Sequence, residues 1–358
     1  MKKKKISDIK VGYACNNNCV HCVISDNRDA LLAQHASINR TFAECKQEIL
    51  NAKLMGTDEI VLTGGEATIR KDFLDLLSII YEQGLRVNLQ SNGRAFYDYE
   101  FAKKTAAFPN IYFTLALHGH NAEFHDRITQ KNGSFKETTT GIRNLLESNK
   151  FVSIKLVLSK FNYKYLNELI ELLDDLKIRH FNLAFPHGLG NASRYFFDVV
   201  PKYSEVKDYI ISALEHSIKK NILFETEAIP YCFLEGYEEF ASEHFSVENQ
   251  IEVRAIERYT DNWHTKRLSI KKKGEKCIQC LFSEICEGPW VEYIENYGDS
   301  ELKPIEITAK NMMYILKKFQ TIKDFRSGKK IAPINRDVCQ EINEKSMSLQ
   351  TRNNKENG

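Results

Sequence analysis

The sequence has little proline, little glycine and almost no net charge. Its 358 residues include 7 Pro and 17 Gly, and 50 Lys+Arg against 48 Asp+Glu leave a formal charge of +2. The low proline and glycine contents exclude collagen-like and low-complexity chains, and a hydrophobic content of 42% excludes a disordered one. Duplex nucleic acid is not an expected partner, because its recognition usually needs a clustered basic face.

A long hydrophobic run is also missing. No window approaches the roughly 18 uncharged apolar residues that a membrane helix needs, and even the apolar stretch 73–80 contains Asp75. The sequence therefore predicts no membrane partner. The basic residues 1–5 resemble the start of a signal peptide, but Asp8 and Lys10 interrupt the apolar stretch that would have to follow. We expect a cytoplasmic protein.

Short β-branched runs alternate with amphipathic stretches through the first two thirds of the chain. Strands are predicted at residues 9–13, 59–63, 85–90, 111–117, 152–158 and 180–185. This alternation predicts a parallel sheet covered by helices, with right-handed crossovers. Eight such units would close a barrel, whereas six leave it open. The expected fold class is α/β, a partial (β/α)6 TIM barrel followed by a small C-terminal domain.

The alternation stops after Phe224, where a region rich in Cys, Tyr and Glu begins. We expect three parts: the barrel over residues 1–222, a smaller domain over 223–304, and a basic tail over 305–358. Residues 310–358 hold 11 Lys+Arg and 5 Asp+Glu. The tail is predicted to be partly helical around residues 312–319 and disordered after Ser346.

Nine cysteines in a long cytosolic chain favour metal binding over a disulfide framework. Cys15, Cys19 and Cys22 directly follow the first predicted strand, at the end of the barrel that holds active sites in such folds. Three thiolates can hold three irons of a [4Fe-4S] cube and leave the fourth iron open for a ligand. A zinc site made of the three cysteines and His21 is the alternative, although zinc ligands usually come in two separated pairs.

Glycines and polar residues follow the next predicted strands. Gly64 and Gly65 would let a ligand approach the backbone and leave Glu66 to receive a cationic group, or they form a plain turn. Ser91 and Asn92 end the third strand, at a turn signal that also brings polar groups to the same barrel mouth. His118 ends the fourth strand, where a ligand contact and a structural histidine are both plausible.

The ordered combination of these cysteines with Gly64, Gly65 and Glu66 resembles the radical S-adenosylmethionine (radical SAM) superfamily. Residues 117–127 and 133–135 are similar to the stretch that follows strand four in many of its members. The resemblance covers roughly residues 8–200. One departure is visible: the residue before the third cysteine is usually aromatic, and here it is His21.

The resemblance implies the cofactors and the chemistry. Cys15, Cys19 and Cys22 would hold a [4Fe-4S] cube whose fourth iron binds S-adenosyl-L-methionine. The glycine turn with Glu66 would take the amino group of that ligand. The polar strand ends at Ser91, Asn92 and His118 would contact its ribose and adenine. The implied reaction is reductive cleavage to a 5′-deoxyadenosyl radical that removes a hydrogen atom from a substrate, with an electron donor such as flavodoxin or ferredoxin.

A second cysteine group, Cys277, Cys280 and Cys286, has a spacing similar to that of the auxiliary-cluster domains called SPASM and twitch domains. In the full SPASM pattern a further cysteine stands where this chain has Trp290, so we expect one auxiliary [4Fe-4S] cluster and two clusters in all. Cys232 is the preferred fourth ligand and Cys339 the alternative. A zinc knuckle is the alternative interpretation, because Cys-x2-Cys is also a common spacing of zinc ligands.

Cys45 lies within a helical pattern and is expected to be a core thiol. Three functions fit the sequence: modification of a ribosomally made peptide by oxidation, cross-linking or epimerisation, the same radical chemistry on a small molecule, and a non-catalytic electron carrier. Glu66 and its glycine turn argue against the carrier. Since 14 residues precede Cys15, we expect no leader-peptide-binding domain before it.

Overall fold

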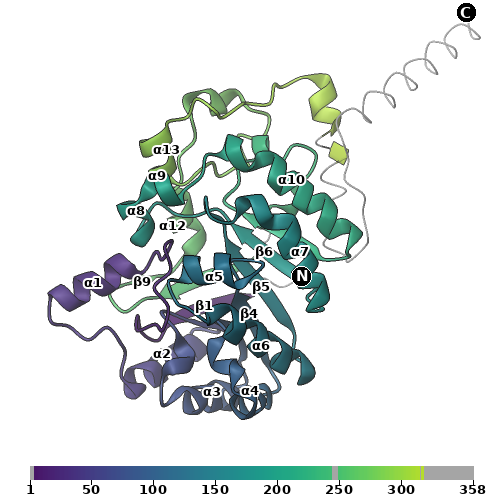
Figure 1. Cartoon of the computed structure of the whole chain (residues 1–358). Helices are drawn as coiled ribbons and strands as arrows, with labels where there is room; N and C mark the ends of the chain where they lie inside the picture. Colours follow the sequence, from purple (N-terminus) through teal and green to yellow (C-terminus); the bar gives the residue numbers. More distant parts are fainter. Residues whose placement is uncertain (1–3, 244–248, 315, 318–358) are drawn as a thin grey trace, which may run out of the picture.

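The computed structural model describes residues 4–243, 249–314 and 316–317. Its central sheet is flanked by α-helices (Figure 1). Within these residues, nine strands form one sheet in the order β7-β6-β5-β4-β3-β2-β1-β8-β9. All neighbouring strands are parallel except β8 and β9. The strands are β1 (Lys5–Lys10), β2 (Glu59–Thr63), β3 (Arg86–Ser91), β4 (Ile111–Ala116), β5 (Val152–Val157), β6 (His180–Ala184), β7 (Leu223–Glu227), β8 (Gln250–Arg254) and β9 (Tyr259–Thr260).

Helices connect successive strands and cover one face of the sheet, where α2, α3, α6 and α10 contact β1, β3, β5 and β7. The α-helices are α1 (Ser25–Ala33), α2 (Phe42–Leu54), α3 (Phe73–Glu82), α4 (Tyr99–Ala106), α5 (Ala122–Thr129), α6 (Ser134–Glu147), α7 (Leu166–Asp175), α8 (Asn191–Arg194), α9 (Phe196–Val199), α10 (Tyr203–Lys219), α12 (Trp263–Ser269) and α13 (Val291–Tyr297). Short 3₁₀ turns are η1 (Ala67–Ile69), η2 (Arg94–Tyr97), η3 (Tyr163–Tyr165), η4 (Tyr231–Phe233), η5 (Glu238–Phe240) and η6 (Glu275–Gln279). This architecture confirms the predicted α/β class and partial TIM barrel.

The first strand lies earlier than its pattern predicted, at Lys5–Lys10 and not at residues 9–13. Its pairing with β2 runs from Ile6 opposite Glu59 to Lys10 opposite Thr63. Asp8 and Lys10 lie on the opposite face from the buried Ile9, whereas the charged Lys5 shares the face of Ile9 and interrupts the apolar pattern there. Residues 11–14 instead leave the sheet and lead into the first cysteine loop.

The parallel sheet has a seventh βα strand that the sequence pattern did not indicate. Strand β7 pairs with β6, from His180 opposite Leu223 to Ala184 opposite Glu227. Its two carboxylates made the segment look unlike a buried strand. In the fold Glu227 forms an ion pair with Lys155 at 2.8 Å, and Glu225 Oε2 lies 2.7 Å from His180 Nε2, within hydrogen-bonding distance. The sheet therefore continues past the expected boundary at residue 222, and β8 extends it beside β1.

The two faces of the barrel strands differ in polarity. Side chains on the helix-covered face are buried in the main core, as Leu62, Leu89 and Phe113 illustrate. The inner face alternates with them and is polar and only partly buried. Thr114 Oγ1 donates to Asn88 Oδ1 at 2.9 Å there. This period-two pattern gives the barrel an apolar shell and a polar interior.

The C-terminal region packs onto the ends of β6 and β7. The hydroxyl oxygen of the buried Tyr293 accepts a 3.0 Å hydrogen bond from the backbone N–H of Tyr203. Residues 309–314 are helical, and the Tyr314 hydroxyl donates to Glu238 at 2.6 Å. Cys339 and most of the expected basic tail lie outside the described residues. Among the residues that the structure describes, no helix has the length and hydropathy of a membrane span.

Candidate active site

The first cysteine loop lies directly against the turn after β2. The N–H of Gly65 donates to the carbonyl of Gly12 at 2.8 Å, and the N–H of Glu66 donates to that of Ala14 at 2.8 Å. A Cβ atom at Gly64 would lie 2.2 Å from the Gly12 oxygen, and one at Gly65 would lie 2.2 Å from the Ala14 oxygen. Both glycines are therefore required by the approach of the cysteine loop itself, a reason that the sequence did not reveal.

The carboxylate of Glu66 joins the ends of β2 and β3. It is 3% exposed, and its Oε1 accepts from the N–H and the hydroxyl of Thr68 at 3.1 and 2.6 Å. Ser91 Oγ donates to Oε1 at 2.8 Å, and the backbone N–H of Asn92 donates to Oε2 at 2.7 Å. The structure thus brings Glu66, Ser91 and Asn92 together, as the sequence predicted.

Arg94 braces the cysteine loop, and the sequence analysis missed it. Its Nη1 donates to the Asn16 carbonyl at 2.6 Å and to Asn17 Oδ1 at 2.8 Å. Asn92 Nδ2 donates to Asn16 Oδ1 at 2.6 Å. At the other end of the loop, Asn191 Nδ2 donates to the Cys19 carbonyl at 2.8 Å. An arginine directly after the Asn-Gly turn was the available signal.

The three thiols of this loop are partly buried and are too far apart to bind one ion together. Burial raises the pKa of Cys15 to about 11 and also raises the pKa of Cys19 and Cys22. Among the described residues, three ligand atoms lie within 4.8 Å of one another only at Cys19, His21 and His118. Because zinc–sulfur bonds are about 2.3 Å long, a zinc ion held by all three thiolates would bring their sulfurs within that limit. The arrangement fits a polynuclear cluster, in which each thiolate binds a separate iron.

Three buried histidines line the same end of the barrel. The rings of His21 and His118 lie 4.5 Å apart, and those of His118 and His125 lie 5.9 Å apart. Val157 N–H donates to His118 Nδ1 at 3.3 Å, so this ring is held in one orientation. Burial lowers the pKa of His118 well below its usual value and lowers those of His21 and His125 to about 4. All three rings are therefore neutral at pH 7.

The stretch after β4 that resembles the radical SAM pattern is held together by one carboxylate, that of Asp126. Asp126 accepts from the N–H groups of Gly133 and Phe135, both at 2.7 Å, and from Ser134 Oγ at 2.8 Å. These bonds satisfy free backbone groups at the start of α6. They fix α6 beside α5, and α5 positions His125.

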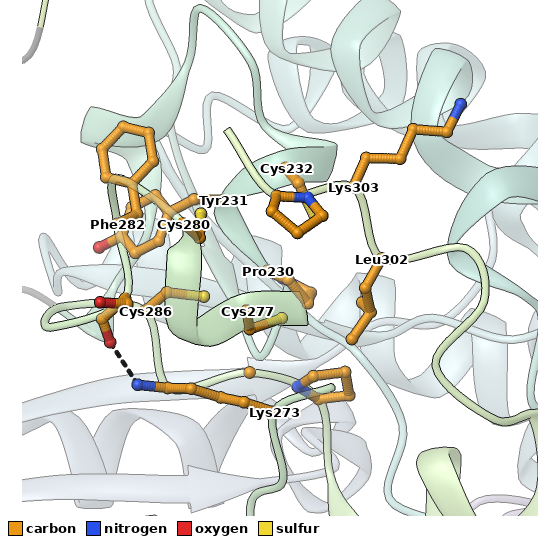
Figure 2. A pocket seen from close by; sticks show the side chains of 14 residues that line it. Pro230, Tyr231, Cys232, Lys273, Cys277, Cys280, Phe282, Cys286, Leu302 and Lys303 are labelled. Atoms are coloured by element: carbon orange, nitrogen blue, oxygen red, sulfur yellow. Dashed lines mark hydrogen bonds between the residues drawn. The ribbon is translucent and has the colours of Figure 1, made fainter. Parts of the chain in front are cut away.

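The second cysteine group closes around a pocket in the C-terminal region. Cys232, Cys277, Cys280 and Cys286 all line it (Figure 2). The N–H of Ile305 donates to Cys280 Sγ at 3.3 Å. Burial raises the pKa of Cys232 to about 12. Four thiols around one pocket form a donor set that fits a closed [4Fe-4S] cluster.

Trp290, which stands where the full SPASM pattern has a cysteine, lies outside this pocket. Its ring stacks on His187 with centroids 3.6 Å apart, and its Nε1 donates to the Phe185 carbonyl at 3.2 Å. The residue thus connects the C-terminal region to the end of β6. Cys45 is fully buried, as expected of a core thiol.

A family model described as "Radical SAM superfamily" matches residues 9–173. The chain contains a radical SAM domain. The matched residues run from β1 into α7 and include the first cysteine loop and Glu66. The radical SAM domain therefore covers the part of the site in which Cys15, Cys19 and Cys22 lie beside Glu66.

Curated relatives share this domain. The AdoMet-dependent heme synthase of Methanosarcina barkeri is 30% identical over 181 residues, 50% of this chain and 50% of that protein. Mycofactocin maturase MftC of Mycolicibacterium smegmatis is 29% identical over 161 residues, 45% and 39% of the two chains. A probable GTP 3′,8-cyclase of Saccharolobus islandicus is 25% identical over 220 residues, which are 60% of this chain and 66% of that protein. The chain spans about half the length of the curated relatives it matches. Their names describe a synthase, a maturase and a cyclase, all of them enzymes.

Solved structures share the fold over most of the chain. Streptococcus suis SuiB bound to S-adenosylmethionine superposes with a TM-score of 0.61 at 17% identity, covering 86% of this chain and 77% of that one. SuiB bound to the precursor peptide SuiA gives 0.59 at 14% identity, with 86% and 76% covered. The anSMEcpe structure with bound AdoMet gives 0.60 at 14% identity, with 94% and 99% covered.

Proposed function

We propose that this chain is a radical SAM enzyme that modifies a peptide. Cys15, Cys19 and Cys22 hold a [4Fe-4S] cluster, and Glu66 receives the amino group of S-adenosyl-L-methionine. Held by these residues, a reduced cluster would supply the electron for reductive cleavage of this cofactor, the source of a 5′-deoxyadenosyl radical able to remove a hydrogen atom from the substrate. A flavodoxin or a ferredoxin is the proposed electron donor.

The protein's own part in this reaction is to hold and orient the reactants. Oε2 of Glu66 accepts one hydrogen bond, so it keeps a lone pair for the cationic amino group. The bonds from Thr68 and Ser91 fix the carboxylate before the cofactor arrives. His118 and His21 stay neutral beside Cys19, because burial lowers the pKa of both rings, so they add no positive charge near the cluster.

A second cluster is proposed in the C-terminal pocket, with Cys232 as the fourth ligand beside Cys277, Cys280 and Cys286. These four thiols line one space, and Cys280 already accepts a backbone hydrogen bond there. A [4Fe-4S] cluster at this place would accept an electron from the substrate or bind the substrate directly. The first role leads to oxidation or a cross-link.

The balanced charges on the inner face of the barrel are the observation that favours a peptide substrate over a phosphate-bearing small molecule. Within the described strands, the cationic groups of that face have carboxylate partners: Lys10 with Asp8 at 3.4 Å, Arg86 with Glu59 at 2.7 Å and Lys155 with Glu227 at 2.8 Å. A phosphate-bearing ligand such as GTP needs surplus positive charge. This face has none, and its neutral, polar character suits the amide groups of a peptide.

The test compares candidate substrates on protein reconstituted anaerobically with iron and sulfide. Dithionite-reduced protein is incubated with S-adenosyl-L-methionine and either synthetic peptides covering the short reading frames beside the gene or GTP. We expect peptide-dependent formation of 5′-deoxyadenosine. A mass change in the peptide identifies the reaction: a loss of about 2 Da for oxidation or cross-linking, and a gain of about 1 Da in deuterated water for epimerisation. Stimulation by GTP and by no peptide would select the small-molecule alternative.

A further inference from the structure

Three polar side chains share the inner face near the carboxyl ends of β5, β6 and β7, and His187, in the segment after β6, interacts electrostatically with two of them, Lys155 and Glu227. We name this surface the Lys155 wall and define it as Lys155, Asn182, His187 and Glu227. Lys155 lies opposite Asn182 in the β5–β6 register, and Glu227 lies two residues beyond the partner of Asn182 on β7, so the three share the inner face. Lys155 and Glu227 stay 34% and 28% exposed, which shows that this face is open.

The wall contains two buried polar atoms without a hydrogen-bond partner in the structure, Asn182 Oδ1 and His187 Nδ1. A buried polar group left unpaired destabilises a fold, and most such groups have a partner. The Lys155–Glu227 ion pair of the same wall is neutral overall. Such a surface can accept and donate hydrogen bonds, and it suits a neutral ligand that does both.

The wall adjoins the first cysteine loop. Val157 follows Lys155 by two residues on β5, about 6.6 Å along a strand, and its N–H donates to His118 Nδ1. His118 in turn has a ring nitrogen within 4.8 Å of the Cys19 sulfur. Two residues of β5 and the ring of His118 therefore connect the wall to the first cysteine loop.

The other side of the wall adjoins the second cysteine group. His187 stacks on Trp290, and Lys271 places its Nζ 4.3 Å from the centre of the same indole ring. Pro289, the residue before Trp290, lines the pocket of the four cysteines. Lys271 is itself paired with Glu243 and Glu287, so it brings no surplus charge to the wall.

From this position and chemistry we infer that the Lys155 wall binds backbone amides of the peptide substrate and positions its reacting residue between the two cysteine groups. The inference rests on the proposed function. A peptide amide offers one N–H and one carbonyl, which match the unpaired acceptor of Asn182 and the Lys155–Glu227 pair. His187 and Asn182 are positioning residues and take no part in the radical step.

The test measures binding and uses Trp290 as the reporter. The chain has two tryptophans, and Trp263→Phe leaves Trp290, whose ring contacts His187. In that background, the reconstituted protein with S-adenosyl-L-methionine is titrated with the flanking-frame peptides and followed by fluorescence. Asn182→Leu removes the unpaired oxygen, and His187→Phe keeps a stacked ring without the nitrogen. Each should weaken peptide binding about ten-fold.

The matched control is Lys220→Met, which breaks a 2.7 Å ion pair with Glu171 on the outer helices and should leave peptide affinity unchanged. If a peptide stimulates 5′-deoxyadenosine formation but binds both wall variants with wild-type affinity, or leaves Trp290 fluorescence unaltered, the wall inference is wrong and the proposed function stands. If no peptide binds the parent protein and GTP stimulates instead, the proposed function itself fails.

Discussion

Replacing Glu66 with Gln tests the cofactor pocket most directly. The substitution keeps the size of the side chain and its 3% exposed position, but it removes the charge and turns one oxygen into an N–H donor. Oε1 receives three donors, two from Thr68 and one from Ser91, while Oε2 receives one from Asn92. The free lone pair of Oε2 is the one available to the amino group of S-adenosyl-L-methionine.

The expected loss of affinity follows from that single bond. A hydrogen bond between charged groups contributes roughly 1.5 to 3 kcal/mol, so the dissociation constant of S-adenosyl-L-methionine should rise about 10- to 100-fold. Equilibrium dialysis with labelled cofactor measures it on anaerobically reconstituted protein. Thr68→Val is the matched control, because it removes one bond to Glu66 and leaves the carboxylate charged. An unchanged dissociation constant in a Glu66→Gln protein with its full iron content would refute the assigned pocket.

Three further predictions concern the clusters and the wall. Reconstituted protein should hold about eight irons and eight sulfides, and replacing the three cysteines of the first loop with Ala should leave about four of each; zinc in the C-terminal site would contradict this. Cys232→Ala should lose about four irons and Cys339→Ala none, by iron counting and Mössbauer spectra, and the reverse result would reassign the fourth ligand. Lys155 lowers the pKa of Glu227 to about 2, so the pair stabilises the fold above the unfolded-state pKa of the carboxyl group and loses its effect as pH falls towards 2. Glu227→Gln should therefore lower the free energy of unfolding by about 2 kcal/mol at pH 7, once solvent screening of the partly exposed pair is allowed for, with a smaller difference in urea titrations near pH 3.

The fold was predictable where the strand pattern is local. Strand β2 matches its predicted range because its apolar run is bounded by Asp58 and Gly64. Strand β7 was missed because its two glutamates look incompatible with a sheet until His180 and Lys155, far away in the sequence, are seen beside them. A pattern within one segment cannot report pairing of that kind.

The candidate active site was also predictable only in the parts that are local in the sequence. The first cysteine group is visible in the sequence because its three cysteines lie within one loop, and Glu66 is visible because two glycines precede it. The bracing by Arg94 was missed, since it depends on carbonyl and amide oxygens brought near it by folding. The wall residues were missed for the same reason: Lys155 and Asn182 look like isolated polar interruptions in apolar strands.

The two cysteine groups are attached to the barrel at different places. The first loop is tied to β2 and β3 by backbone hydrogen bonds and by Arg94. The second group reaches the barrel at Trp290 and Tyr293, where ring contacts with His187 and Tyr203 are combined with hydrogen bonds to Phe185 and Tyr203. Directional hydrogen bonds therefore fix both groups to the barrel strands or to the segments that follow them. The Lys155 wall lies on those same strands, so a substrate bound there would be held in a fixed position relative to both groups, as presentation of one hydrogen atom to the radical requires.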